Sequence, residues 1–350
     1  MNSKENMYKV FRGETPDYIP AAPHWWGVYK FQKAGLANNF DDMDNLPGID
    51  AKALAEIDIG FYEAYKPDWF HLGTGPSCLP PDPDRDKQIN DIIPAVRRLD
   101  SYNAIDEFIS LISSTPEEIK ASGIYEHVRI IASKYGDEVF IILNEGNPAG
   151  YILDPHGLIG FEEGMVALAQ KPDIMGYLMY ELYKDRLPHM KVLAEYGCHG
   201  YVGSETMISA DLISPRMYRD IVFPSQEMFY RETRKLGIEP INYFLGDIVP
   251  LMPYINRLDL TALLVEESKK GFELDIVKIR KELAEHITLF GNLDSVGTLL
   301  FGNKEDVRQE TLKQLEAARY GRFVMANGSP LTFDTPDENL RTMITTARGF

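Results

Sequence analysis

Cysteine is scarce in this sequence, and long hydrophobic runs are absent. The only two cysteines, Cys78 and Cys198, lie far apart and fit no zinc-binding spacing, so we expect reduced thiols. We expect Cys78 to pack within a proline-rich loop and Cys198 to be structural. No run of 18 or more apolar residues occurs, so no membrane-spanning helix is predicted. The first residues lack the apolar core of a signal peptide, which predicts a cytoplasmic location.

Positive charge is also in short supply. The 350-residue chain has 36 basic and 53 acidic residues, a net charge of −17. A chain this acidic, without basic clusters, is poorly suited to nucleic acid or to an anionic membrane surface. The nucleotide-binding motifs GxGxxG and GxxxxGK[ST] are missing as well, which argues against a doubly wound nucleotide-binding fold.

What the sequence does contain is a regular alternation of apolar runs and amphipathic helical patterns. This alternation predicts an α/β protein, a single (β/α)8 TIM barrel spanning residues 1–350. The predicted strands are Ile19–His24, Asp68–Leu72, Val139–Leu143, Gly200–Val202, Pro240–Leu245, Leu260–Val265, Ile287–Phe290 and Arg322–Met325. The clearest predicted helices are Thr115–Tyr135, Lys171–Tyr196, Ser214–Leu236, Asp275–Glu285 and Lys304–Tyr320.

One connection is unusually long. Residues Gly73–Tyr102, after the second predicted strand, are rich in proline and charge. Such a segment usually covers a site or carries a small hairpin, so we expect a long loop or a hairpin insertion there.

Polar residues follow almost every predicted strand. Active sites of such barrels lie at the carboxyl ends of the strands, so these side chains should converge on one mouth. They are His24, Trp25, Trp26, His71, Asn144, Glu145, Asn147, Ser204, Glu205, Tyr243, Asp247, Glu266, Glu267, Asn292, Asp294, Asn327 and Ser329. Any one of them can be an ordinary loop residue, and Asp247 and Asp294 most resemble helix caps.

The predicted mouth is acidic, aromatic and rich in amides, with arginine and lysine missing. A site for phosphate or several carboxylates would need those cations. The mouth therefore suits a neutral or weakly charged aromatic ligand, a metal ion or a proton donor. An aromatic wall of Trp25, Trp26 and Tyr29 beside His71 suits a flat ring, and plain core packing is the alternative interpretation of these residues.

Three segments together resemble the uroporphyrinogen decarboxylase superfamily, which includes corrinoid-dependent methyltransferases. They are Leu212–Pro224 (LISPRMYRDIVFP), Leu289–Val307 (LFGNLDSVGTLLFGNKEDV) and Asn327–Asn339 (NGSPLTFDTPDEN). The resemblance runs in order over most of the chain and implies a TIM barrel.

Departures from the superfamily patterns narrow the expected reaction. The decarboxylases resemble one another in an arginine-rich segment after the first strand, but this chain has HWWGVYKFQKAG there, without arginine. The zinc methyltransferases use a His-x-Cys and a later cysteine, and those positions match Tyr243, Leu245 and Ser329. A thiolate zinc site of that type is therefore not expected, although the resemblance keeps a carboxylate at Glu266. An oxygen- and nitrogen-rich metal site of Glu266, Glu205, His24 or His71 stays open.

The segments LVEESKKGFELDIVKIRKEL and APHWWGVYKFQ resemble the methyltransferase I components of anaerobic O-demethylases. That resemblance implies methyl transfer from a phenyl methyl ether to the Co(I) corrinoid (cobalamin) of a partner protein. The expected partners are a corrinoid protein and a small aromatic substrate, with a homodimer as a further assembly to test. Alternatives are another methyl donor (a methylamine, a thiol or methanol), a decarboxylase, and a non-catalytic barrel that binds a tetrapyrrole or a protein.

The expected roles of the mouth residues follow from this reaction. A leaving phenolate needs a proton donor or a Lewis acid near the ether oxygen. The candidates for catalysis are Glu266, Glu267, Tyr243, His24 and Glu205. The candidates for binding substrate are Trp25, Trp26, Tyr29, His71, Asn144, Asn242, Asn327 and Ser329.

Overall fold

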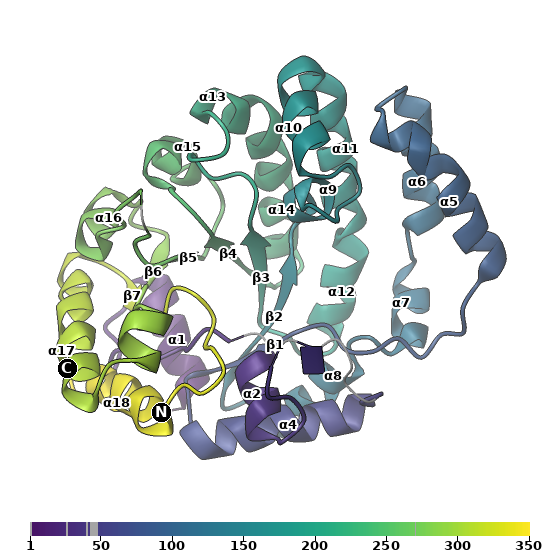
Figure 1. Ribbon diagram of the computed structural model, residues 1–350. Coiled ribbons are helices and arrows are strands. Elements are labelled where there is room, and N and C mark those ends of the chain that lie inside the picture. The colour runs from purple at the N-terminus through teal and green to yellow at the C-terminus, as the bar shows by residue number, and fades with distance from the viewer. Residues whose placement is uncertain (1, 26, 40, 43–47, 270) are drawn as a thin grey trace.

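A parallel β-sheet in chain order forms the centre of the molecule, and helices surround it (Figure 1). The computed structural model describes residues 2–25, 27–39, 41–42, 48–269 and 271–350. Within them every neighbouring pair of strands is parallel. The seven strands are β1 Trp69–Leu72, β2 Phe140–Gly146, β3 Gly200–Glu205, β4 Glu239–Phe244, β5 Ala262–Val265, β6 Thr288–Phe290 and β7 Phe323–Val324.

The predicted first strand, Ile19–His24, does not form as a strand. Its middle still hydrogen-bonds to both edges of the sheet: Ala22 N–H donates to the Met325 carbonyl and Asp68 N–H to the Ala21 carbonyl, each at 2.8 Å. Proline at positions 20 and 23 removes backbone donors and keeps the ladder short. The α/β architecture with a parallel sheet is confirmed, whereas a full eight-stranded barrel is not.

Helices follow most strands and cover the outer face of the sheet. In the first half of the chain they are α1 Ser3–Arg12, α2 Val28–Lys33, α4 Ala51–Tyr65, α5 Pro83–Arg97, α6 Tyr102–Ile112, α7 Pro116–Ser122, α8 Glu126–Tyr135, α9 Pro148–Leu153, α10 Phe161–Gln170 and α11 Pro172–Asp185. In the second half they are α12 Leu187–Glu195, α13 Pro215–Met217, η1 Tyr218–Val222, α14 Phe223–Lys235, η2 Val249–Leu251, α15 Met252–Ile255, α16 Ile276–Glu282, η3 Ser295–Leu300, α17 Lys304–Leu315, η4 Glu316–Tyr320 and α18 Asp337–Arg348.

Several predicted helices are interrupted. The helix predicted over Thr115–Tyr135 forms as α7 and α8, because Gly123 adopts the left-handed conformation (φ 74°) and ends α7. The one predicted over Lys171–Tyr196 likewise forms as α11 and α12. The pattern over Ser214–Leu236 passes through a π-helical turn, η1, before α14.

The connection after β1 is not a hairpin. Its first ten residues, 73–82, carry no helix or strand, and helix α5 then begins where Asp82 caps it and proline occupies the first turn. Cys78 in this loop is exposed, so the prediction that it packs is wrong, while Cys198 is buried as predicted. Both thiols are free. None of the described helices is long and apolar enough to cross a membrane.

Strand register decides which polar residues reach the mouth. Successive residues of a strand face opposite sides of the sheet. Ser204 pairs with Tyr243, and Gly203 pairs with Asn242. Ser204 and Tyr243 therefore face the inner side of the curved sheet together, whereas Gly203, Glu205 and Asn242 face the surrounding helices.

Candidate functional site

A chain of side-chain contacts crosses the carboxyl ends of β1, β2 and β3. The Trp25 backbone N–H donates to His71 Nδ1 at 3.0 Å. His71 Nε2 lies 2.9 Å from the side-chain amide of Asn144. Ser204 Oγ lies 2.9 Å from the other end of that amide. Three strands and the segment before α2 are thus joined through buried or half-buried polar groups at the mouth.

An apolar pocket of about 460 Å³ opens over this chain. Its wall is formed by Trp25, Phe31, Leu54 and Leu72, with Trp25 packed against the Phe61 ring at 4.1 Å between centroids. The other lining residues are Gly27, Lys30, His71, Gly73, Thr74, Asn144, Glu145, Gly146, Ser204 and Thr206. An apolar wall with a few polar groups at one end is the usual form of a small-molecule site.

The positive charge in this pocket is paired within the protein. Lys30 on α2 donates to Asp58 on α4 at 2.6 Å, and both side chains are almost fully buried. Burial raises the pKa of Asp58, and Lys30 opposes that shift. The ion pair joins the two helices that carry Phe31 and Leu54, so it supports the pocket wall.

His24 lies next to this pocket and beside Tyr243. Its ring centroid is 5.0 Å from that of His71 and 4.3 Å from that of Tyr243. Asn327 fixes the His24 backbone by accepting from its N–H and donating to its carbonyl, each at 2.8 Å. Burial lowers the pKa of His24 to about 4, so the ring is neutral near pH 7.

The neutral His24 ring presents a bare acceptor. Its Nδ1 lies 3.2 Å from the Gly328 carbonyl, which can only accept, so Nδ1 carries the proton. Nε2 is buried and has no hydrogen-bond partner among the described residues. Nε2 is thus an unused acceptor within the buried layer beside Tyr243.

The Tyr243 hydroxyl is a second buried polar group without a hydrogen-bond partner in the described part of the chain. Burial raises the pKa of Tyr243 well above its usual value, and the negative charges of Glu266 and Glu267 raise it further. The phenol therefore keeps its proton at neutral pH. Its hydroxyl is a donor that no described residue uses, and it lies in register with the pocket residue Ser204.

Glu266 and Glu267 lie at the mouth, and a lysine bridges them. Lys269 pairs with Glu266 at 3.3 Å and also with Glu267. Glu267 accepts from the Ser329 N–H at 2.6 Å and from the Ser329 hydroxyl at 2.8 Å. A Cβ at Gly328 would lie 2.3 Å from the Glu267 backbone nitrogen, so glycine permits this close approach.

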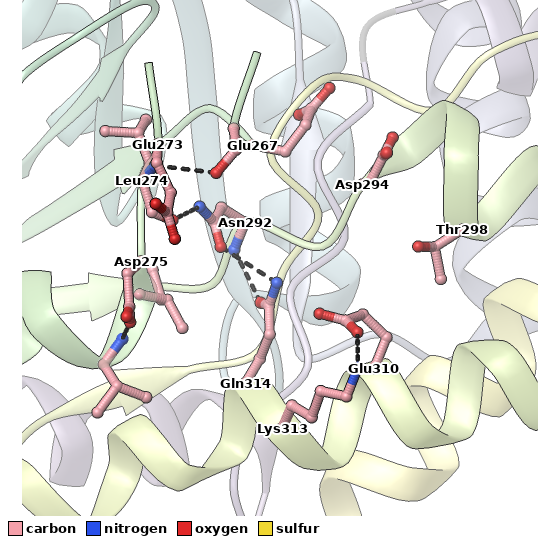
Figure 2. A pocket seen from close by; sticks show the side chains of 13 residues that line it. Glu267, Glu273, Leu274, Asp275, Asn292, Asp294, Thr298, Glu310, Lys313 and Gln314 are labelled. Carbon is pink, nitrogen blue, oxygen red and sulfur yellow. Dashed lines mark hydrogen bonds and ion pairs between the residues drawn. The ribbon is translucent and has the colours of Figure 1, made fainter. Parts of the chain in front are cut away.

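A second, more acidic pocket of about 430 Å³ adjoins Glu267 between the β5–α16 connection and α17 (Figure 2). Asn292 N–H donates to the Gln314 side chain at 3.0 Å, and the same residues pair again through their amides at 3.1 Å. Asp294 accepts from the N–H groups of residues 296 and 297 at the start of η3, as predicted for a cap. Asp247 likewise accepts from Val249 N–H.

Four residues predicted for the mouth or for substrate binding lie elsewhere, namely Glu205, Asn147, Asn242 and Tyr29. Glu205 faces the helices and accepts from Tyr183 at 2.5 Å and from Gln226 and Asn147 at 2.6 Å. Asn242 faces the same way and is fully buried. The Tyr29 hydroxyl points to Tyr65 and Asp337, at 3.3 and 3.0 Å. Strand alternation turns Glu205 and Asn242 away from the mouth, and the helical face of α2 does the same for Tyr29. Trp26 lies outside the described residues.

The prediction that the mouth lacks lysine and arginine is wrong. Lys30 lines the pocket, Lys269 joins the two glutamates, and Arg186 pairs with Glu145 at 2.6 Å near the rim. These cations come from a helix face or from loops, which strand-end patterns do not reveal. Ser204 was recognised only as a strand-end residue, and the Glu205 beside it was selected as the functional group.

A metal site is not evident among the described residues, where no three His, Cys, Asp or Glu side chains gather closely enough to hold an ion. Of the four candidate ligands, Glu205 faces away from the mouth. The positions that the family resemblance associates with thiolate zinc ligands are Tyr243, Leu245 and Ser329, and these side chains do not fit such a site.

Comparison with known proteins gives the family. The sequence model of the family described as "Uroporphyrinogen decarboxylase (URO-D)" matches residues 2–350. The chain belongs to this family. A solved "methyltransferase from Methanosarcina mazei" shares the fold, with a TM-score of 0.72 over 99% of this chain and 98% of that one at 16% identity.

Curated relatives match over part of their length. "Methylcobamide:CoM methyltransferase MtbA" of Methanosarcina mazei is 24% identical over 230 residues, which are 65% of this chain and 63% of the relative. "Methylated-thiol--coenzyme M methyltransferase" of the same organism is 26% identical over 44% of this chain and 39% of the relative. A uroporphyrinogen decarboxylase of Trichodesmium erythraeum is 25% identical over 40% and 38%. The family is thus shown, and the reaction must be argued from the site.

Proposed function

We propose that this protein transfers a methyl group from a methoxylated aromatic compound to the corrinoid of a partner protein. The observation that carries the proposal is the pocket of about 460 Å³, which Trp25 and Phe31 line together with polar groups such as Asn144 and Ser204. Relatives named as methylcobamide and methylated-thiol methyltransferases support methyl transfer as the reaction type.

The pocket accounts for binding of the ring and exclusion of water. Aromatic side chains offer large apolar contact area and favour offset or edge-to-face contact with another ring. The cations at the mouth, Lys30, Lys269 and Arg186, are each paired with a carboxylate. A substrate with several carboxylates would have to compete with those pairs, so uroporphyrinogen is a poor fit.

Negative charge develops on the leaving oxygen during methyl transfer. The partner's corrinoid supplies the electron pair that receives the methyl carbon, and the electrons of the broken carbon–oxygen bond stay on the oxygen, so a phenolate leaves. The Tyr243 hydroxyl is suited to donate a hydrogen bond to that oxygen, because it has no hydrogen-bond partner among the described residues and its neighbour in the interior layer, Ser204, lines the pocket. One such donor typically contributes about 10²–10³ in rate.

The other candidate catalytic groups have different surroundings. His24 offers an unpartnered acceptor, while Glu266 and Glu267 share Lys269, whose charge can offset negative charge that develops nearby. Glu205 lies behind β3 and belongs to a buried network with α11 and α14. We assign Glu205 a structural role.

A thiol or another methyl donor is the second candidate, because the methylated-thiol enzyme is among the relatives. The test is incubation of the purified protein with cob(I)alamin and a donor panel: methoxybenzene, methylthiobenzene, methanol and methylamine. The methylcobalamin spectrum should appear with methoxybenzene and should weaken strongly in Tyr243→Phe. No methylcobalamin with any donor would refute methyl transfer, and formation only from another donor would refute the aromatic ether.

A further inference from the structure

The protonation state of His71 can be deduced from its contacts. Its Nδ1 accepts the Trp25 backbone N–H, which is always a donor, so Nδ1 has no proton. Burial lowers the pKa of His71 well below its usual value, which agrees with a neutral ring. A neutral imidazole without a proton on Nδ1 carries it on Nε2. His71 Nε2 is therefore a donor towards Asn144.

This donor fixes the orientation of the Asn144 amide. The amide lies 2.9 Å from Nε2, and a hydrogen bond at that distance requires its oxygen, not its nitrogen, to face His71. The two ends of an amide have nearly the same shape, so the hydrogen-bond network decides which is which. The Asn144 nitrogen then faces Ser204 Oγ at 2.9 Å and donates to it.

The orientation of the Asn144 amide determines which hydrogen bond the Ser204 hydroxyl can offer in the pocket. Ser204 Oγ accepts from Asn144, so its own proton is not used in the chain, and no other acceptor for it is present among the described residues. Ser204 is buried and lines the pocket. We propose that the Ser204 hydroxyl, oriented by His71 and Asn144, donates a hydrogen bond to the bound ligand and selects ligands with an oxygen acceptor there.

This inference rests on the proposed function only for its substrate class. An ether oxygen has lone pairs and no proton, so it matches a fixed O–H donor. A methylammonium ion has no lone pair to offer, and a thioether sulfur is a weak acceptor. Ser204 would thus favour methoxy compounds over amines and thioethers, through a contact that the ligand's apolar ring does not provide.

A binding experiment can isolate this contact. Methoxybenzene and ethylbenzene have similar shapes, but only methoxybenzene has an acceptor, and Trp25 fluorescence or ligand NMR can report binding of each. One net hydrogen bond should make methoxybenzene bind about 2- to 10-fold more tightly to the unmodified chain. Ser204→Ala should remove this preference by weakening methoxybenzene alone. The matched control is Ser225→Ala, which changes a buried serine on α14 and should keep the preference.

Asn144→Asp tests the orientation of the chain. An ionised aspartate can only accept, so it would take the Ser204 proton and the His71 proton together. The preference for methoxybenzene should then disappear even though Ser204 is present. A preference retained in folded Asn144→Asp would overturn the proposed orientation, and one retained in Ser204→Ala would overturn the role of Ser204.

The histidine tautomer provides a readout that needs neither ligand nor variant. In ¹⁵N-histidine-labelled protein, His71 should show a protonated Nε2 and a bare Nδ1; a protonated Nδ1 would overturn the inference even if Asn144→Asp does not fold. Failure of the proposed function looks different. If the preference for methoxybenzene depends on Ser204 but no methylcobalamin forms, only methyl transfer is refuted. If methylcobalamin forms but the preference does not depend on Ser204, only the Ser204 contact is refuted.

Discussion

Removal of the Lys30 ammonium should lower the stability of the fold, because it leaves its buried partner Asp58 unpaired beside the pocket. The two side chains are 4% and 2% exposed and lie 2.6 Å apart, and the second oxygen of Asp58 has no partner among the described residues. Lys30→Met keeps most of the side-chain volume but leaves the Asp58 carboxylate buried without its cation. Loss of one partner of a buried pair typically costs 3–5 kcal/mol, so we expect the free energy of unfolding at pH 7 to fall by about that amount.

The pH dependence gives this test a definite sign. Burial raises the pKa of Asp58, and without Lys30 it should rise further. A carboxylate with a raised pKa in the folded state disfavours folding once the pH exceeds its unfolded pKa, roughly 4. The deficit in Lys30→Met should therefore be small near pH 4 and grow as the pH rises, until the pH passes the folded pKa.

The measurement is urea unfolding followed by circular dichroism, with Lys30→Met/Asp58→Leu as the matched control. The double variant removes both charges, and such replacements are often neutral or stabilising, so most of the lost stability should return. A single variant that loses less than about 1 kcal/mol at pH 7 would refute this reasoning. So would a double variant as unstable as the single one.

Three further predictions concern the Tyr243 hydroxyl, the Glu205 network behind β3 and the buried histidines. Tyr243→Phe should slow methyl transfer by about 10²–10³ with little change in KM or in the unfolding midpoint, and an unchanged rate would exclude Tyr243 as a hydrogen-bond donor to the leaving oxygen. Glu205→Leu leaves three donors without their acceptor and should lower stability by about 1–3 kcal/mol, while Glu205→Gln keeps an acceptor and should cost less; a KM change in Glu205→Gln would contradict the structural role. Burial lowers the pKa of His24, His127 and His199 to about 4. Their neutral forms should stabilise the fold above about pH 6.5, and stability should be lost as the pH falls towards 4; a flat stability profile between these values would contradict their burial.

Much of the fold followed from local patterns, and the errors have local causes. The predicted strands at Val139–Leu143 and Pro240–Leu245 overlap β2 and β4, because continuous apolar runs suit a sheet buried on both faces. Ile19–His24 has the same apolar character but contains two prolines, and only its contacts with both sheet edges show where it lies. Helix α5 was missed because its segment reads as a polar, proline-rich connection.

The candidate site was also predicted only in part from the sequence. The sequence alone determined that polar residues end the strands and that His71, Asn144 and Tyr243 stand at those ends, because chain order places the ends of parallel strands at one rim. His24 follows a segment that does not form a strand, and only its contacts show that it lies beside His71 and Tyr243. Only the tertiary structure decided which of them face inward. One residue along β3 separates Ser204, in the pocket layer, from Glu205, buried against helices, because a strand turns each successive side chain to the opposite face. Lys30 reached the pocket through packing of α2 against α4, which no local pattern encodes. Lys269 lies only two and three residues from Glu267 and Glu266, but the turn that brings it back onto them is not visible in the strand-end pattern.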